Sequence, residues 1–256
     1  MKSILSVVNQ KGGVGKSTTV VNLGASLSQK GYKTLIIDCD PQGNATTGLG
    51  IQKAEVDYGS YSMLLGSVPE VKSIHECIEN LFVLGAEDEL IGAEVELTHQ
   101  ENREYRLRDS LAVISDGFDC ILIDCPPSLG FLTINAMTAS NGLIVPLQCE
   151  YYALEGLSQL LKTMKAIKKS LNPSLSEWRI LLTMYDKRNN LSKQVVEEVY
   201  SHFSSLIFEV VIPRNVRLSE APSYGKPISL YAPQSVGAKA YDYLANELIK
   251  IFNIKK

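Results

Sequence analysis

The amino-acid sequence predicts an α/β fold: a doubly wound, mostly parallel sheet with helices on both faces. Short apolar runs alternate with longer amphipathic ones along the chain, which is the pattern of successive βαβ units. Most of the short runs show no apolar–polar alternation, as is typical of strands buried on both faces. With 256 residues, 45% of them hydrophobic, the chain can form one sizeable core. We therefore expect a single domain over residues 1–256.

The predicted elements can be placed in order along the chain. Strands are expected at short aliphatic runs, over residues 4–8, 34–39, 81–84, 120–124, 143–147, 179–184 and 208–212. Helices are expected where apolar residues recur at helical spacing, over residues 16–30, 105–115, 132–140, 154–171, 192–205 and 237–252. The segment 51–100 is more polar and less regular, so we expect it to be an elaboration on the sheet.

The net charge of −3 does not indicate a polyanion as partner, but the charges are unevenly distributed. Residues 85–110 hold eight acidic and three basic side chains, whereas residues 162–193 hold eight basic and two acidic ones. The basic tract is either a surface for a polyanion or an ordinary solvated helix face. The five cysteines lack the spacing of metal ligands, and we recognise neither a leader nor an apolar run of roughly 20 residues. These features predict a cytoplasmic protein with reduced thiols.

Residues 10–18, Gln-Lys-Gly-Gly-Val-Gly-Lys-Ser-Thr, directly follow the first predicted strand and have the composition of a phosphate-binding loop. Glycines allow consecutive backbone N–H groups to turn toward an anion, and the helix that follows adds its positive end. In such a loop Lys16 reaches the terminal phosphates and the Ser17 hydroxyl binds Mg²⁺. The strict pattern G-x-x-x-x-G-K-[ST] is not met, because Gln10 stands at its first position. The loop instead contains a second lysine, Lys11, which suggests a nucleotide site shared between two subunits.

Three aspartates follow predicted strands: Asp38 and Asp40 after the second, and Asp124 after the fourth. Ligands of open parallel sheets bind at the carboxyl ends of the strands, where an aspartate can hold Mg²⁺ beside a nucleotide. A single such aspartate is weak support, since many cap a following helix. Together with the phosphate loop, the three predict a nucleoside triphosphatase.

The roles within this set follow from the needs of phosphoryl transfer. Asp124 is assigned to the metal together with Ser17. Asp40 is assigned to positioning the attacking water, with capping of its own loop as the simpler alternative. Residues 126–130, Pro-Pro-Ser-Leu-Gly, form a second loop that can respond to the γ-phosphate.

Longer strings resemble the ParA/Soj family of deviant Walker-A ATPases, in the short form without an N-terminal helix-turn-helix domain. These strings are NQKGGVGKST (9–18), DCDPQGNAT (38–46), IDCPPSLG (123–130), QCEYYALEGL (148–157), LTMYD (182–186) and IPRNVRLSEAP (212–222). The resemblance runs from the first strand to Tyr243 and is weakly supported only over 51–100. It is far more specific than the phosphate loop alone.

The resemblance implies an ATP-dependent dimerisation switch for chromosome or plasmid partitioning. With ATP and Mg²⁺ bound, a homodimer would close and bind double-stranded DNA without sequence preference, and a ParB-like activator would stimulate a slow intrinsic hydrolysis. Phosphate contacts would make the DNA affinity strongly salt-dependent. The protein would then associate with the nucleoid.

By the same resemblance, individual residues receive roles. Lys11 reaches across to the partner subunit's nucleotide and is catalytic together with Lys16 and Asp40, and Gly12 must be small where two phosphate loops approach. The nucleotide-binding set is Lys11, Gly12, Gly13, Val14, Gly15, Lys16, Ser17, Thr18, Pro213 and Asn215, the last two at the adenine. Arg188 and Arg217 are expected to contact DNA, although Arg188 could solvate a loop and Arg217 could anchor a helix start.

Three other functions use a similar site. A MinD-like switch on a membrane surface would need a terminal amphipathic helix, but the apolar stripe over 241–252 is followed only by residues 253–256, so we expect no stable membrane anchor. A ligase that phosphorylates a small carboxylate would need an added pocket, and no His, Arg or Ser cluster stands out in 51–100 to form it. An iron–sulfur ATPase would need a second cysteine placed to pair with Cys125.

Overall fold

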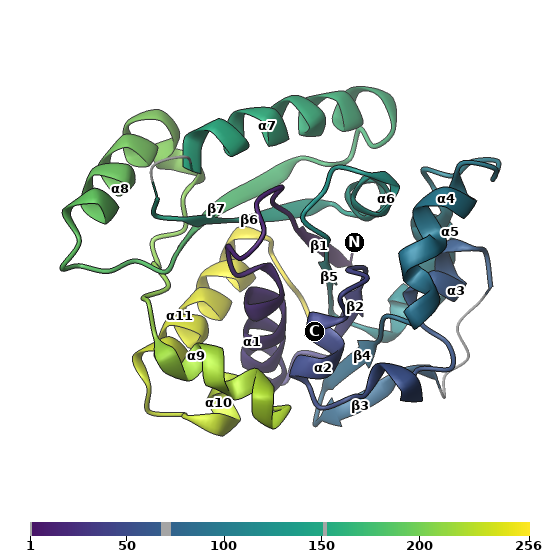
Figure 1. Cartoon of the computed structure of the whole chain (residues 1–256), viewed down its shortest axis with the longest axis horizontal. Coiled ribbons are helices and arrows are strands. Elements are labelled where there is room, and N and C mark those ends of the chain that lie inside the picture. The colour runs from purple at the N-terminus through teal and green to yellow at the C-terminus, as the bar shows by residue number, and fades with distance from the viewer. Residues whose placement is uncertain (1, 68–72, 151–152) are drawn as a thin grey trace.

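The computed structural model describes residues 2–67, 73–150 and 153–256, and its centre is a seven-stranded sheet. The strand order is β3-β4-β2-β5-β1-β6-β7, and every pairing is parallel except that of β3 with β4 (Figure 1). The strands are β1 (Ser3–Val7), β2 (Thr34–Asp38), β3 (His75–Ile78), β4 (Leu81–Leu84), β5 (Cys120–Asp124), β6 (Gly142–Gln148) and β7 (Glu177–Thr183).

Helices of very different lengths connect these strands. The longer helices are α1 (Lys16–Gln29), α5 (Arg106–Ile114), α6 (Phe131–Ala139), α7 (Ala153–Ser170), α8 (Asn190–Phe203) and α11 (Val236–Ile251). The shorter ones are α2 (Asn44–Gly48), α3 (Ser60–Leu64), α4 (Ala93–Leu97), α9 (Val216–Glu220) and α10 (Ile228–Tyr231). Single 3₁₀ turns add η1 (Lys53–Glu55), η3 (Asp88–Gly92), η4 (Ser115–Gly117), η5 (Ser204–Leu206) and η6 (Ala221–Tyr224).

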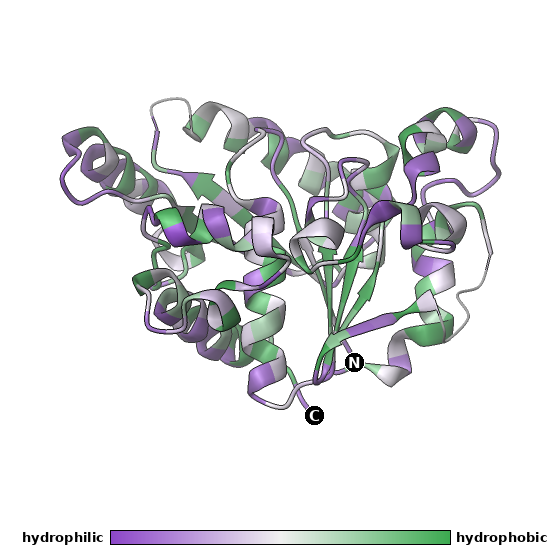
Figure 2. Ribbon diagram, turned by 60° about the horizontal axis from the view of Figure 1, so that its bottom comes forward, coloured by the Kyte–Doolittle hydropathy of each residue, from purple (hydrophilic) through white to green (hydrophobic). Residues whose placement is uncertain are grey.

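Helices cover both faces of the sheet, so the predicted fold class is confirmed. Helices α1, α2, α9, α10 and α11 pack on one face, and α3 to α8 pack on the other. Strand β5 contributes Ile121 and Ile123 to one core and Leu122 to the other, because successive side chains of a strand point to opposite faces. The apolar strands accordingly run through the middle of the molecule between two helical layers (Figure 2).

Helix α1, which follows the phosphate loop, lies between the sheet and α11. Its Leu23 and Leu27 are fully buried, and burial of each contributes about 1.5–3 kcal/mol. A Cβ atom at Gly24 would lie 2.9 Å from Cδ1 of Ile36 on β2, so a larger residue would require the side chain of Ile36 to move. This packing fixes the direction in which the first turn of α1 points.

Most predicted boundaries differ from the observed ones by one or two residues, but the strand predicted at 208–212 is wrong. Among the described residues this segment forms two isolated bridges, Ile180 with Ile207 and Tyr185 with Pro213, and the amides of Phe208 and Ile212 donate to the carbonyls of Ile180 and Leu182 on β7, at 2.9 Å each. Between them the amides of Glu209 and Val210 donate to the Glu247 carboxylate of α11, at 2.7 and 3.2 Å. Glu247 of the last helix thus binds two amides between the two that bond to β7, and the regular pairing of a strand is interrupted there.

The segment 51–100 contributes to the sheet itself. Its β4 pairs in parallel with β2, and β3 adds an antiparallel edge that the sequence did not predict. Residues 68–72 of this segment, and Tyr151 and Tyr152 of the string 148–157, lie outside the described residues. Over the part of the chain that is described, no helix is both long and apolar enough to cross a membrane.

Candidate nucleotide site

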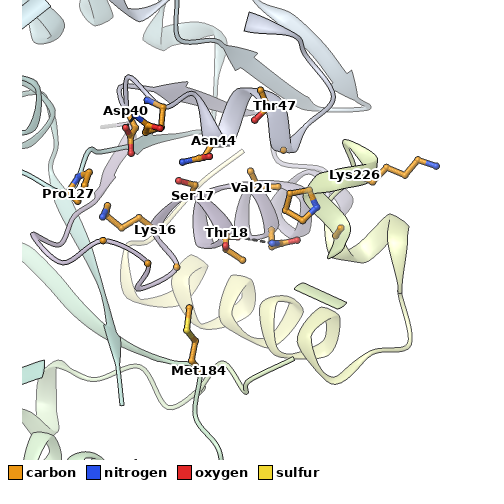
Figure 3. Close-up of a pocket in the computed structure, with 18 residues that line it drawn as sticks. Lys16, Ser17, Thr18, Val21, Asp40, Asn44, Thr47, Pro127, Met184 and Lys226 are labelled. Atoms are coloured by element: carbon orange, nitrogen blue, oxygen red, sulfur yellow. Dashed lines mark hydrogen bonds between the residues drawn. The ribbon is translucent and has the colours of Figure 1, made fainter. Parts of the chain in front are cut away.

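The loop between β1 and α1 adopts the shape that its glycines predict. Gly13 and Gly15 have φ angles of +74° and +91°, in the left-handed region that favours glycine. Gly15 caps the N-terminus of α1, so the first free N–H groups of that helix open onto the loop. The loop borders a pocket of about 370 Å³, which Gly12, Ser17 and Thr18 also line (Figure 3).

Buried side chains fix the loop at both of its ends. At the start, Asn9 donates through Nδ2 to the carbonyl of Pro146 on β6 at 2.7 Å and accepts from the amide of Lys11 at 3.0 Å. Further along, the Thr183 hydroxyl at the end of β7 donates to the carbonyl of Val14 at 2.9 Å. The loop is thus held against two neighbouring strands before any ligand binds.

Lys16 lies inside the pocket rather than in solvent. Its residue is only 6% exposed, and its Nζ donates to the carbonyl of Lys11 at 3.2 Å. Burial lowers the pKa of this ammonium, while the nearby Asp124, Cys125 and Asp40 act in the opposite direction. The Lys16 side chain is thus placed where its ammonium would meet an anion bound in the loop.

Asp124 ends β5 beside the loop and has no hydrogen-bond partner among the described residues. It is fully buried, and both carboxylate oxygens lack a donor. Burial, followed by the neighbouring charge of Asp38, raises its pKa well above 3.8, while the Ser17 side chain acts in the opposite direction. A buried carboxylate whose oxygens are free, next to a hydroxyl, fits a divalent cation such as Mg²⁺, which prefers oxygen ligands.

Asp38 lies in register with Asp124 on the neighbouring strand, but its oxygens are occupied. Oδ2 accepts from the backbone amide and the hydroxyl of Thr46, at 2.8 and 2.7 Å, and Oδ1 accepts from the amide of Asp40 at 3.1 Å. Burial raises the pKa of Asp38 to about 6, and the hydrogen bonds from Thr46 limit the rise. Asp38 therefore holds α2 and the loop before it in place. Of the three aspartates predicted for the site, it has a structural role, whereas the oxygens of Asp124 are left for a ligand.

Asp40 opens the loop after β2 and faces the pocket. Its Oδ1 accepts from the amide of Gln42 at 3.0 Å, and its carbonyl accepts from Gly43 at 2.8 Å. Asp40 and Pro127 lie near Lys16 and Ser17, while Met184 approaches the loop from the opposite side (Figure 3). Asp40 therefore caps its loop and, with its second oxygen, remains directed at the pocket.

A second pocket of about 540 Å³ continues from the first, because Gly15, Thr18 and Met184 line both. Pro213 and Asn215 line this second pocket, so the structure brings them together with the phosphate loop. Asn215 also caps α9, since its Oδ1 accepts from the amide of Arg217 at 2.9 Å. The joined pockets have room for an elongated ligand with an anionic end and a flat apolar end.

Sequence reasoning missed two residues of this site. Met184 has a φ angle of +53°, which is strained for a methionine, and no sequence pattern predicts it. Glu150 forms an ion pair with Lys11, Nζ to Oε2 at 2.6 Å, with both side chains nearly half exposed. Lys11 itself lines neither pocket, although its partner Glu150 lines the second one. A Cβ atom at Gly12 would lie 4.0 Å from the Cβ atom of Pro127, an ordinary van der Waals contact, so the packing of the described residues does not require a glycine there.

The two predicted DNA contacts are exposed arginines in local ion pairs. Arg188 donates to both oxygens of Asp186, at 3.1 and 2.9 Å, and these bonds lower the pKa of Asp186 to about 2. Arg217 donates to Glu220 at 2.7 Å. Neither arginine lines either pocket, and Arg217 is the second residue of α9, two positions after Asn215.

Comparisons with known proteins agree with this geometry. The sequence model of a family described as an AAA domain matches residues 2–177. The chain is 53% identical over 249 residues to the sporulation initiation inhibitor protein Soj of Bacillus subtilis, covering 97% of this chain and 98% of the relative. It is 52% identical over 248 residues to the chromosome partitioning protein ParA of Myxococcus xanthus, covering 96% and 88%. A crystal structure of cobyrinic acid a,c-diamide synthase from Mycobacterium smegmatis with bound ADP and magnesium matches with a TM-score of 0.86 and 36% identity, covering 99% of this chain and 96% of that one.

Proposed function

Because this chain belongs to the ParA/Soj family of partitioning ATPases, we propose that it is an ATP-dependent dimerisation switch that binds DNA without sequence preference. Hydrolysis of ATP resets the switch and so drives the partitioning of a chromosome or plasmid. The observation that carries the proposal is the buried, unpartnered carboxylate of Asp124 beside a glycine-rich loop at a helix N-terminus. That pair supplies what a Mg²⁺–nucleotide requires.

The phosphate loop binds the nucleotide in cis. The N–H groups of the loop and the ammonium of Lys16 bind the phosphates, and Thr18, Pro213 and Asn215 contact the nucleoside in the second pocket. The hydroxyl of Ser17 and the carboxylate of Asp124 are the ligands for Mg²⁺. When bound, the metal supplies positive charge that stabilises the charge developing on the phosphates.

Asp40 orients the attacking water. Its loop and the loop that contains Pro127 lie on the same side of the pocket, where a terminal phosphate would reach. The bond from Gln42 goes to Oδ1, and no described residue donates to the second oxygen, which is left for a water. Orientation without full proton removal is consistent with slow intrinsic hydrolysis, and an activator protein would complete the arrangement.

Lys11 and Gly12 form the dimer-dependent part of the site. The Lys11 ammonium pairs with Glu150, so it can reach a nucleotide of the partner subunit only after this ion pair opens. An exposed pair of this kind contributes about 1 kcal/mol or less, which a phosphate readily offsets. A Cβ atom at Gly12 would fit within one subunit, so the need for a glycine there is assigned to the close approach of two loops.

DNA binding is assigned to Arg188 and Arg217. Both guanidinium groups are exposed, and each is held in shape by one carboxylate, Asp186 or Glu220. Phosphates of DNA would compete with those carboxylates, so the affinity should fall steeply with salt. A dimer doubles these contacts, which explains why DNA binding would depend on ATP.

The alternatives weighed from the sequence receive less support. A MinD-like membrane switch would need a free apolar stripe on the last helix, but Tyr241, Leu244 and Leu248 of α11 are buried in the core. A ligase acting on a small carboxylate would need a basic subsite in the elaboration. Residues 73–102 contain eight acidic side chains and neither lysine nor arginine, which would repel such a substrate.

The decisive experiment measures binding to nonspecific double-stranded DNA with ATP, with ADP and without nucleotide, across a salt series. We expect tight binding with ATP only, and a slope against salt that becomes shallower by about one phosphate contact per site in Arg217→Glu. Arg108→Glu is the matched control, because Arg108 is also an exposed arginine paired with a neighbouring acid, Asp109, but lies on α5. Its DNA affinity should equal that of the wild type.

Binding that is equally strong without ATP, or absent with ATP at every salt concentration, would refute the DNA switch. Equal losses in Arg217→Glu and Arg108→Glu would show that only net charge matters and would remove the assignment of Arg217.

A further inference from the structure

The surface around η6 and α10 combines an exposed aromatic ring with an excess of positive charge. From residue 213 to residue 241 the chain contains four basic side chains and a single acidic one, Glu220. Within this stretch Tyr224 is 63% exposed, and its ring stacks on that of Tyr231, with 4.8 Å between the centroids and 28° between the planes. We call aromatic platform the surface formed by Tyr224, Tyr231, Arg217 and Lys226.

A shared acceptor joins the tyrosine pair to the arginine. The Tyr231 hydroxyl and the Arg217 guanidinium both donate to Oε2 of Glu220, at 3.1 and 2.7 Å. The guanidinium therefore lies beside the hydroxyl end of Tyr231. Lys226, two positions after Tyr224, is exposed, and its side chain points away from the phosphate loop (Figure 3). The platform thus offers two cations next to an aromatic pair.

The backbone that carries Tyr224 is well packed, so the exposure of its ring does not result from a poorly ordered turn. The next residue, Gly225, has a φ angle of +60°, and a Cβ atom there would lie 2.6 Å from Cα of Gly50, just after α2. Ala221 and Ile228, on either side of the turn, are 2% and 1% exposed. A ring that is held in place before binding loses little conformational entropy when a ligand covers it.

The stacked ring of Tyr224 fits the flat face of an unpaired base. Tyr231 covers one face of this ring, and the large exposed fraction shows that much of the rest is open. Proteins bind single-stranded nucleic acids by stacking bases on aromatic rings and by placing cations along the backbone. In a duplex, neighbouring base pairs already cover the faces of each base. The platform therefore favours a strand whose bases are unpaired.

We propose that the aromatic platform binds single-stranded nucleic acid, with one base stacked on Tyr224 and the neighbouring phosphates paired with Arg217 and Lys226. The exposed Val216, at the start of α9, offers an apolar contact to a sugar. All of these residues belong to one subunit, so this binding needs neither ATP nor a second subunit. It goes beyond the proposed switch, which concerns double-stranded DNA, and shares only Arg217 with it.

The test measures the affinity for a short, fluorescein-labelled oligo(dT) by fluorescence anisotropy, at low salt and without nucleotide. Tyr224→Leu should weaken binding by about tenfold, because one stacked base is lost, whereas Tyr224→Phe should bind like the wild type. Tyr243→Leu is the matched control, because Tyr243 is also a 63% exposed tyrosine but lies on α11. Its affinity should stay unchanged, and circular dichroism checks that all variants fold.

A strand of the same length that consists of abasic sites separates stacking from charge. It retains the phosphates and lacks the bases, so the wild type should bind it about tenfold more weakly than oligo(dT). Tyr224→Leu should bind the two strands equally, and Arg217→Glu should weaken the binding of both. Oligo(rU) also has unpaired pyrimidines, so Tyr224→Leu should weaken its binding by the same factor as that of oligo(dT).

Two results for single strands would overturn the proposal. The first is equal binding of oligo(dT) and the abasic strand by the wild type, and the second is an equal loss in Tyr224→Leu and Tyr243→Leu. Both would mean general attraction between opposite charges. Self-association without nucleotide that Tyr224→Leu abolishes would overturn it as well, because a second copy of the chain would then cover the ring.

Binding of double-stranded DNA with ATP separates this inference from the proposed function. Tyr224→Leu should leave that binding unchanged, and an equal loss for duplex and single strand would overturn the role of Tyr224 in recognising unpaired bases. A protein that binds duplex DNA only with ATP but does not distinguish oligo(dT) from the abasic strand would retain the switch and lose the platform. A protein that distinguishes these strands but never binds duplex DNA would do the reverse.

Discussion

Asp38 and Asp124 end neighbouring parallel strands, lie in register and are both fully buried, but their carboxylates are used in opposite ways. Three donors converge on Asp38, whereas no described residue donates to Asp124. The protein therefore stabilises one buried negative charge internally and leaves the other for a ligand. An acidic residue at the end of a strand acquires its role from the donors that the following loop brings to it.

Among the substitutions that test this difference between Asp38 and Asp124, the largest effect is expected for Asp124→Asn. Loss of a metal ligand should lower ATP hydrolysis by about 1,000-fold, which corresponds to about 4 kcal/mol. The unfolding free energy without nucleotide should rise by about 1 kcal/mol, because a buried, unpartnered charge beside Asp38 disappears. Steady-state kinetics measures the loss of ATP hydrolysis, and urea unfolding measures the gain in stability. Asp116→Asn, at an exposed aspartate, is the control for both. A variant that is less stable and still active would reverse the assignment.

The complementary substitution is Asp38→Ala. It leaves the amides of Thr46 and Asp40 and the Thr46 hydroxyl buried without an acceptor, so the unfolding free energy should fall by about 3 kcal/mol. Asp38→Asn retains one acceptor oxygen and should lose less. Urea unfolding measures both. If Asp38→Ala were as stable as Asp124→Asn, the difference between the two aspartates would not be structural.

Asp40 is intermediate between Asp38 and Asp124, because it accepts one hydrogen bond and also lines the pocket. The substitution Asp40→Ala therefore tests the comparison further. Hydrolysis should fall by about 100-fold with little change in ATP affinity, since the residue is proposed to act on water rather than on the nucleotide. The variant should then accumulate as an ATP-bound dimer, which sedimentation with ATP would detect. A variant that stays monomeric with ATP would remove the proposed role of Asp40.

The same two carboxylates should also make the stability of the protein depend on pH. Burial raises the pKa of Asp38 from 3.8 to about 6, so the folded state binds a proton that the unfolded state has released, and stability falls as the pH rises from about 4 to about 6. Asp124, whose pKa is raised further, continues this loss at higher pH. Urea unfolding at a series of pH values should lose the lower part of the slope in Asp38→Asn and the upper part in Asp124→Asn. An unchanged profile in both variants would contradict the burial of these charges.

The sequence predicted the architecture well because its main features are visible over a few neighbouring residues. Strands buried on both faces appear as uninterrupted aliphatic runs, and backbone positions with positive φ appear as glycines. It could not separate Asp38 from Asp124, since the decisive donor, Thr46, is eight positions away and becomes a partner only after α2 forms. The ion pair of Lys11 with Glu150 joins residues 139 positions apart, and the strain at Met184 has no local signature. The strand predicted at 208–212 failed for the same reason, because Glu247 on a distant helix takes its amides.

The contact of Glu247 with the 207–213 segment has a consequence for how this protein behaves at high concentration. A long, exposed edge strand is a template for intermolecular strand pairing and aggregation. Here the 207–213 segment lies along β7 and donates to it from the amides of Phe208 and Ile212, while the other edge, β3, is four residues long and has an irregular register. Neither edge offers a continuous ladder of free amides and carbonyls. At high local concentration these chains would therefore associate through side-chain surfaces rather than by pairing strands between molecules. Association of that kind remains reversible.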